Sequence, residues 1–332
     1  MSTAEPAPSG AHAAAVAHVE PSPEEPPVLL AERARIAVDD IVALDDLTVT
    51  TRGDRVLFIG DVTVLFAALS GVPLLAASPP DPTAEAPAVA GEARIVAGVL
   101  RLGGHEVAPH AHHAHTGFAP LDPPVPRTMS VLDYVIWAAR LTGARPRAAR
   151  EMAHAALKRV GLEQAARRPP ATLGTAERRG LQIAKAIVHD PRILVAEAPL
   201  DGLEGAGAAY VLGALAAATE GRSALLSARQ VDPTTPEGAL ARGATHLILL
   251  GERGVLAEGT PAELSSAARV YRLTVPANAE PLRAALAERG LTLQRGPLHF
   301  TVELPDGAST TLLLEAAASA KAPVIELSPL FG

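Results

Sequence analysis

Apolar residues in the middle of the chain follow two different patterns in succession. Over residues 177–188 they recur at the spacing of one helical face. Pro191 then ends the predicted helix, because proline lacks a backbone N–H and clashes with the preceding turn. Ile193–Ala196 is apolar at every position, which is typical of a strand buried on both faces of a parallel sheet. Glu197 follows directly, at the strand end where open α/β sheets place their ligands.

Similar patterns on both sides of this segment predict an α/β fold. Continuous apolar runs predict further buried strands at Val56–Ile59, Ser223–Arg229 and His246–Leu250. Helical spacing of apolar residues predicts amphipathic helices at Val131–Leu141 and Ala148–Val160.

The two ends of the chain differ from this central part. Residues 1–28 are rich in Ala, Pro and Glu without periodicity, so we expect a disordered extension over 1–32. Residues 270–328 predict strand, helix, two strands, helix and strand, the order of a ferredoxin-like βαββαβ unit. The predicted organisation is an extension, a main domain over 33–268 and a small α+β domain over 269–332.

The composition narrows the functional classes. The net charge of −7 argues against a nucleic-acid partner. The chain has no cysteine, which excludes disulfides and thiol catalysis and is compatible with a reducing cytoplasm. The N-terminus lacks the pattern of a signal peptide. The apolar stretch Val62–Ala77 is interrupted by Gly71 and Pro73 and is shorter than the ~20 residues that cross a bilayer.

The order of motifs around the central strand resembles that of ABC transporter ATPases. That family has a signature LSGGQ, a segment like ARALLHDP, a strand ending in Asp-Glu-Pro and a loop like SGLD. The corresponding residues here are the signature Leu173, Gly174, Thr175, Ala176 and Glu177, then Ala184–Pro191, Glu197–Pro199 and Leu200–Glu204. The resemblance implies a P-loop NTPase-like ABC nucleotide-binding-domain fold with a helical subdomain at about 127–172. The C-terminal unit resembles the small domain of ABC-2 exporter ATPases.

Several positions that bind nucleotide in that family carry other residue types here. The family's loop G-x-x-x-x-G-K-[ST] wraps phosphates with backbone N–H groups and contributes a lysine. In this chain Gly60 and Asp61 lead directly to an apolar helix, with Val62 in place of the lysine and Thr63 in place of the Ser/Thr. The loop is therefore about four residues shorter than the motif. No aromatic residue precedes Phe58 to stack on adenine.

The positions that serve hydrolysis in the family differ as well. Leu121 stands for the glutamine near Mg²⁺, Glu197 for the magnesium-binding aspartate, Ala198 for the catalytic glutamate and Arg229 for the histidine. Alanine cannot act as a general base. In the signature, Glu177 places a negative charge at a helix N-terminus, which repels phosphate. The family implies ATP and Mg²⁺ as cofactors, but these residues predict that neither binds and that there is no metal site.

We therefore expect a non-hydrolysing partner or scaffold subunit of a membrane export complex. The resemblance implies another ABC ATPase-like subunit as a partner, contacted through Leu200–Glu204, together with an integral-membrane permease. It also implies a cytoplasmic location, peripheral at the inner face of the membrane. One alternative is a soluble regulatory or adaptor protein that reuses the fold, and another is an active ATPase with unusual motifs.

Three further predictions concern single side chains and one tract. Glu197 and Arg229 follow neighbouring strands, so we expect an ion pair between them, the alternative being an Arg229 that points into solvent. Trp137 lies either in the core or on the surface that contacts the membrane subunit in the family. The tract His110–His115 is interpreted as a solvated loop rather than a metal site.

Overall fold

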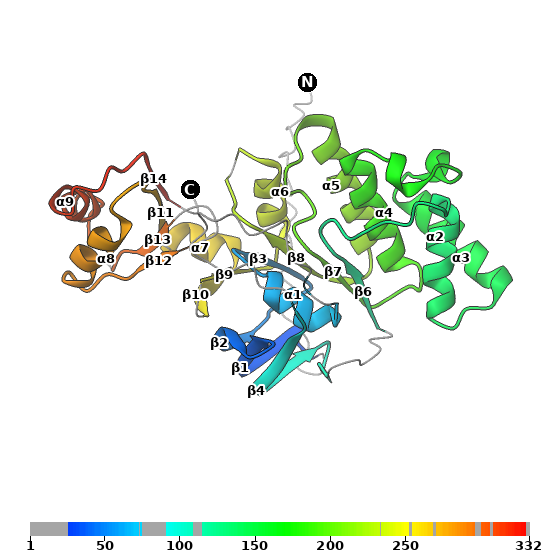
Figure 1. Ribbon diagram of the computed structural model, residues 1–332, viewed down its shortest axis with the longest axis horizontal. Helices are drawn as coiled ribbons and strands as arrows, with labels where there is room; N and C mark the ends of the chain where they lie inside the picture. The colour runs from blue at the N-terminus through cyan, green and yellow to red at the C-terminus, as the bar shows by residue number, and fades with distance from the viewer. Residues whose placement is uncertain are drawn as a thin grey trace, which may run out of the picture.

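The structure, a computed structural model, describes residues 26–72, 74, 91–108, 115–232, 234–251, 254–267, 270–295, 300–305 and 308–329. Within these ranges the chain forms a central sheet with a second sheet on one side and a group of helices on the other (Figure 1). A small C-terminal unit, orange to red in Figure 1, lies at the opposite end from the green helices. Most of the extension 1–32, the stretch 75–90 and most of the histidine tract lie outside the described residues.

The central sheet has the strand order β10-β9-β3-β8-β7-β6. Its strands are β3 (Arg55–Ile59), β6 (Thr116–Ala119), β7 (Ile193–Ala196), β8 (Ser223–Ala228), β9 (His246–Leu250) and β10 (Val255–Gly259). All neighbouring pairs are parallel except β9 with β10. The inner strands are buried at almost every position because both faces are covered, which confirms the predicted α/β sheet.

Helix α1 (Thr63–Ser70) packs between the central sheet and an antiparallel second sheet of order β2-β1-β4-β5. The strands of the second sheet are β1 (Leu29–Val38), β2 (Ile41–Thr50), β4 (Ala93–Leu102) and β5 (His105–Glu106). Phe66 of α1 meets Phe58 of β3 edge to face, with 6.5 Å between ring centroids. The apolar side chains of α1 are therefore packed into the core between the two sheets, which fixes the position of the helix.

The disordered extension predicted for residues 1–32 is wrong at its C-terminal end. Strand β1 begins at Leu29, whose side chain is fully buried in the core beneath the second sheet. The Leu29 N–H donates to Thr51 Oγ1 at 2.8 Å, and Leu29 pairs with Leu102 of β4. The apolar side chains at the end of the Ala/Pro-rich stretch gain burial there, which offsets the entropy of ordering the backbone.

A group of helices covers the other face of the central sheet and extends beyond β6. It consists of α2 (Val131–Leu141), α3 (Pro146–Arg159), α4 (Thr175–Ile187), α5 (Gly205–Thr219) and the short 3₁₀ turns Glu163–Ala165 and Pro170–Thr172. Helix α2 has the predicted bounds, and Ser130 Oγ accepts the Asp133 N–H at 3.1 Å as its N-cap. Trp137 lies on the surface of α2 with 47% of it exposed, so the core alternative is wrong.

Two shorter helices complete the main body. Helix α6 (Pro236–Gly243) lies between β8 and β9 in the chain, and α7 (Pro261–Ala267) follows β10. Side chains from both helices join the core on the face of the sheet that carries Leu57 and Ile59. No helix in the described part of the chain is both long and apolar enough to span a bilayer.

The C-terminal unit has the predicted ferredoxin-like order of elements. They are β11 (Val270–Thr274), α8 (Ala279–Ala287), β12 (Leu293–Arg295), β13 (Phe300–Glu303), α9 (Thr311–Ser319) and β14 (Glu326–Pro329). The antiparallel sheet order β12-β13-β11-β14 places the first strand between the third and the fourth. Arg272 Nη2 of β11 lies 2.7 Å from Glu326 Oε1 of β14. The same nitrogen lies 3.8 Å from Oδ2 of Asp232, a residue that follows β8 in the chain. The exact domain boundaries stay predictions.

Candidate functional site

The carboxyl ends of four parallel strands meet at one edge of the central sheet. The register pairs Ile59 of β3 with Ala228 of β8, and Ala119 of β6 with Ala196 of β7. A cavity of about 230 Å³ lies at this edge, lined by Gly60, Asp61, Val62, Thr63, Leu121, Glu197, Ala198, Ser227 and Arg229. The positions that the sequence places at the nucleotide site are therefore brought together, while the signature residues 173–177 lie at the start of α4.

The connection from β3 to α1 consists of Gly60, Asp61 and Val62. Gly60 has a φ of +123°, and a Cβ there would collide with the carbonyl oxygen of Leu250, so only glycine fits. Its N–H donates to Ala228 O at 3.0 Å. Asp61 Oδ1 accepts the Thr63 N–H at 3.0 Å, and the Val62 side chain is buried in the core. The connection therefore presents a carboxylate, with the N–H groups of Gly60 and Thr63 used inside the chain.

A magnesium-bound triphosphate does not fit the residues of this edge. Phosphate cradles use several free backbone N–H groups and a lysine, whereas this connection is short and carries Asp61. Among the described residues that line the cavity, the only cationic side chain is that of Arg229. No group of three or more His, Asp or Glu side chains in the described ranges could hold a metal ion.

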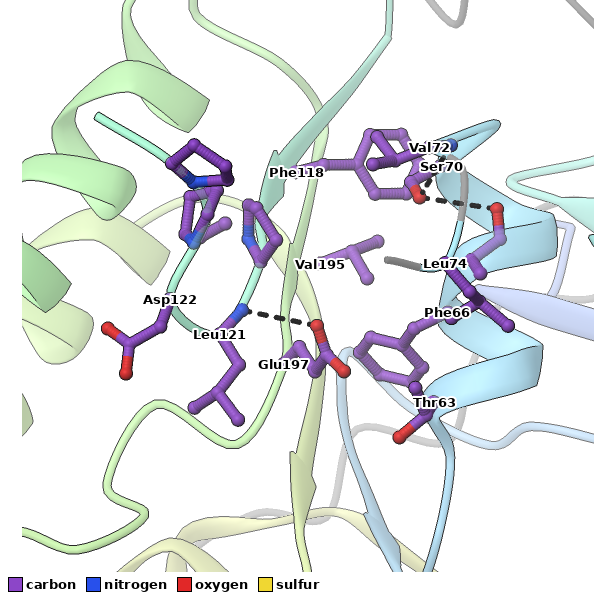
Figure 2. Close-up of a pocket in the computed structure, with 15 residues that line it drawn as sticks. Thr63, Phe66, Ser70, Val72, Leu74, Phe118, Leu121, Asp122, Val195 and Glu197 are labelled. Carbon is purple, nitrogen blue, oxygen red and sulfur yellow. Dashed lines mark hydrogen bonds between the residues drawn. The ribbon is translucent and has the colours of Figure 1, made fainter. Parts of the chain in front are cut away.

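Glu197 is a half-buried carboxyl group fixed by the segment that follows β6. Its Oε2 accepts the Leu121 N–H at 3.1 Å (Figure 2). Burial raises the pKa of Glu197, and the nearby Asp61 carboxylate raises it further. The Leu121 N–H and the charges of Arg229 and Arg179 lower this pKa, but burial is the largest effect. Glu197 therefore holds a proton more readily than an exposed glutamate does.

The predicted ion pair between Glu197 and Arg229 is wrong. Both side chains reach the same cavity, but Arg229 Nη2 lies 3.6 Å from Asp201 Oδ2, in the loop after β7. Both members of this pair keep contact with solvent, so the pair forms with little desolvation cost. Glu197 instead receives a backbone N–H, which satisfies one carboxylate oxygen without an arginine.

Ala198, at the position of the family's catalytic glutamate, has a strained backbone. Its φ is +37°, a value that non-glycine residues seldom adopt. The Ala198 N–H donates to Ser227 Oγ at 2.8 Å, and both groups are buried. This hydrogen bond between the ends of β7 and β8 holds the turn, but the methyl side chain offers no proton-transfer group.

Arg179 is a residue of this region that the sequence reasoning missed. Its guanidinium Nη1 donates to Leu121 O at 3.1 Å and lies 2.7 Å from Asp122 Oδ1. The N–H of Leu121 is held by Glu197, so this residue is fixed on both sides. A signal was available, because Arg179 precedes Ile183 by one helical turn and therefore shares the buried face of α4.

The signature residues lie where α4 begins, with Gly174 as its N-cap and Thr175 as its first residue. Glu177 Oε2 accepts the Gly174 N–H at 2.9 Å, while Glu177 Oε1 lies 3.0 Å from Arg168 Nη1. The carboxylate thus occupies the end of the helix dipole that would otherwise attract an anion. The expectation that Glu177 places a negative charge at this helix end is confirmed.

Comparisons with known proteins bear on the family. No family model matches the chain. It is 27% identical over 196 residues to the human phospholipid-transporting ATPase ABCA7, and the matched segment covers 58% of this chain and 9% of that protein. It is 29% identical over 157 residues to the phosphite import ATP-binding protein PxtA of Stutzerimonas stutzeri, covering 45% and 55%. The matched part thus spans about a tenth of the length of ABCA7 and about half of PxtA.

Solved structures show the fold. CbiO1 of Clostridium perfringens, part of the ABC transporter complex cbiONQ, matches with a TM-score of 0.56 and 18% identity, covering 73% of this chain and 92% of that one. MJ1267, an ATP-binding cassette of an ABC transporter, matches with a TM-score of 0.53 and 17% identity, covering 70% and 91%. The proteins similar to this chain in sequence and in structure are ATP-binding domains of ABC transporters, and the chain has their P-loop NTPase fold.

Proposed function

We propose that this chain, which has the fold of the ABC ATPase domains, does not hydrolyse ATP and serves as a partner or scaffold subunit of a membrane export complex. The observation that carries this proposal is the direct connection from β3 to α1 through Gly60, Asp61 and Val62. Phosphoryl transfer depends on a loop and a cation that hold the phosphates and neutralise the charge that develops on them. The Asp61 carboxylate in this connection repels the phosphates, and it cannot neutralise the negative charge that develops on them.

Two further sites support the same proposal. Ala198 provides no general base at the position of the family's catalytic glutamate. At the start of α4, Glu177 holds the Gly174 N–H that a phosphate of a facing subunit would need. The chain is thus poorly suited both to its own hydrolysis and to completing the site of a partner.

The proposed partners are an ABC ATPase-like subunit and an integral-membrane permease. Leu200–Glu204 keeps the compact turn between β7 and α5 that the family uses at its dimer interface. Trp137 and Leu141 expose apolar surface on α2, 47% and 64% of each residue, where the family contacts its membrane subunit. In this proposal the protein lies in the cytoplasm, peripheral to the inner face of the membrane.

Calorimetric titration of the full chain with Mg-ATP tests the absence of nucleotide binding. We expect no saturable heat, and a dissociation constant below ~1 mM, about −4 kcal/mol, would overturn the proposal. An active ABC ATPase titrated in the same buffer is the positive control. This experiment separates the proposal from an active ATPase with unusual motifs.

Purification after mild membrane solubilisation tests the partners. We expect a permease and a second ABC subunit to be recovered with the chain, and light scattering of the co-expressed pair to show a dimer of unlike chains. Recovery of the chain as a monomer, or with soluble partners alone, would favour a regulatory or adaptor protein instead. The Trp137→Ala variant is the control for specific recovery, because it changes the exposed surface of α2.

A further inference from the structure

A second cavity adjoins the polar one on the other side of Glu197. It encloses about 360 Å³ between α1 and the segment after β6, a volume in the range of small-molecule sites. Most of its lining is apolar, with the rings of Phe66 and Phe118 and with Ala67 and Val195 among the residues that form it (Figure 2). Thr63, Leu121 and Glu197 line both cavities, so the two are neighbours.

The charged groups of this apolar cavity are all acidic. Its described lining holds the carboxyl groups of Glu197 and Asp122 and no Lys, Arg or His side chain. Asp122 pairs with Arg179 at 2.7 Å, which compensates its charge. Glu197 uses Oε2 to accept the Leu121 N–H, and this contact fixes the carboxyl group at the cavity wall. A ligand that enters the cavity therefore meets one carboxyl group, that of Glu197, for which the described part of the chain provides no cation within ion-pair distance.

We propose that this cavity binds a small organic cation with an apolar body, whose charged group lies against the Glu197 carboxylate. The apolar body replaces water along the phenylalanine and proline side chains, which favours binding by the hydrophobic effect. The proposal goes beyond the proposed function and does not depend on it, because it concerns a second cavity, which shares only Thr63, Leu121 and Glu197 with the first.

Charge complementarity favours an organic cation over an anion or a neutral molecule in this cavity. An anion such as a nucleotide or a fatty acid would meet Glu197 and, across the shared wall, Asp61, with Arg229 already paired to Asp201. A neutral apolar molecule would desolvate the Glu197 carboxylate and offer no charge to its Oε1, since only Oε2 accepts the Leu121 N–H, and this is costly. The rings of Phe66 and Phe118 add cation–π attraction for an ammonium group that passes over their faces.

The test uses three probes of one shape on the full-length protein: phenethylamine, phenethyl alcohol and phenylacetate. Ligand-observed NMR titrations compare wild type with Glu197→Gln, which keeps an acceptor for the Leu121 N–H but removes the charge. The control is Glu204→Gln, an exposed carboxylate that lines neither cavity. Ala67→Leu, which fills the cavity, is the second variant, and circular dichroism checks its fold.

We expect phenethylamine to bind wild type and Glu204→Gln equally and at least about tenfold more tightly than the alcohol, with phenylacetate weakest. Glu197→Gln should weaken phenethylamine by about tenfold and should not weaken the alcohol, while folded Ala67→Leu should lose all three probes. Equal binding of phenylacetate, binding that Glu197→Gln does not alter, or no binding of phenethylamine would each overturn the proposal. If Ala67→Leu does not fold, the Glu197→Gln comparison decides alone.

Discussion

Arg179 and Asp122 form a 2.7 Å ion pair in which the arginine is 5% exposed and the carboxylate 54% exposed. The same guanidinium donates to Leu121 O, and Glu197 accepts the N–H of that residue. Leu121 stands at the position of the glutamine that lies near Mg²⁺ in the ABC family, which the chain resembles. Here it is held from both sides by side chains of α4 and of the end of β7, which ties the helical group to the central sheet.

Arg179→Ala should lower the free energy of unfolding by about 1.5–3 kcal/mol, because it removes charge-assisted hydrogen bonds from a buried position. Urea unfolding followed by circular dichroism measures this difference. Arg147→Ala is the matched control, since the Arg147 side chain is 94% exposed and its pair with Glu151 is worth less than about 1 kcal/mol. Equal losses in the two variants would contradict the role assigned to Arg179.

Gly60→Ala should destabilise the protein by more than about 1 kcal/mol. The φ of +123° and the approach of Leu250 O leave no room for a Cβ, so the connection to α1 must shift. Gly213→Ala is the control within α5, where a Cβ meets nothing within 4 Å and alanine favours the helix. Thermal unfolding should separate them, with the midpoint falling for Gly60→Ala and staying level or rising for Gly213→Ala.

Glu177→Ala should cost about 1 kcal/mol of stability, because it removes the acceptor of the Gly174 N–H and the partner of Arg168 at the start of α4. Denaturant titration gives the value. Glu204→Ala, at the start of α5, is the comparison, since its side chain makes no capping hydrogen bond and its loss should stay within about 0.5 kcal/mol. A neutral Glu177→Ala would show that the first turn of α4 holds without this cap.

Stability should depend on pH through Glu197. Because burial raises its pKa in the folded state, the folded protein binds more protons than the unfolded one between the ordinary value of 4.5 and the raised pKa. The contribution of Glu197 to the free energy of unfolding therefore falls as pH rises through that window. Urea titrations at a series of pH values should show Glu197→Gln gaining stability relative to wild type over the window. A difference that is constant with pH would refute this assignment.

The fluorescence of the protein should report a partly exposed indole, because Trp137 is its only tryptophan and 47% of it is accessible. We expect red-shifted emission and strong acrylamide quenching in the isolated chain. Trp137→Ala should cost well below the roughly 3–5 kcal/mol of a buried aromatic, although the ring stacks on Tyr134 at 6.1 Å. Blue-shifted emission that acrylamide does not quench would place the indole in a core.

The sequence was sufficient to predict the helices and strands whose bounds depend on the local pattern of buried residues and on helix caps. Helix Val131–Leu141 and strand Ile193–Ala196 have the predicted bounds, since local periodicity and a Ser130 cap specify them. The meeting of Gly60, Leu121 and Glu197 at one edge also followed from parallel strands that end side by side.

The sequence alone could not predict which charged side chains form ion pairs with one another. Arg229 lies near both Glu197 and Asp201, and the choice between them depends on the solvation of each carboxylate in three dimensions. The contacts of Arg179 with Leu121 and Asp122 join segments far apart in the chain, and no local pattern reports them. Likewise Leu29 starts a strand within a Pro-rich stretch because of its distant neighbours in β4.

Substitutions alter side chains, but they cannot lengthen a backbone. Between Ile59 and Thr63 the chain has only Gly60, Asp61 and Val62, and Gly60 is already committed to its contacts with Ala228 and Leu250. A lineage that carries this connection could therefore regain a phosphate-wrapping loop only through an in-frame insertion of several codons. In the proteins descended from it, point mutations alone could adapt this edge of the sheet to other functions, but they could not restore a loop that binds phosphate.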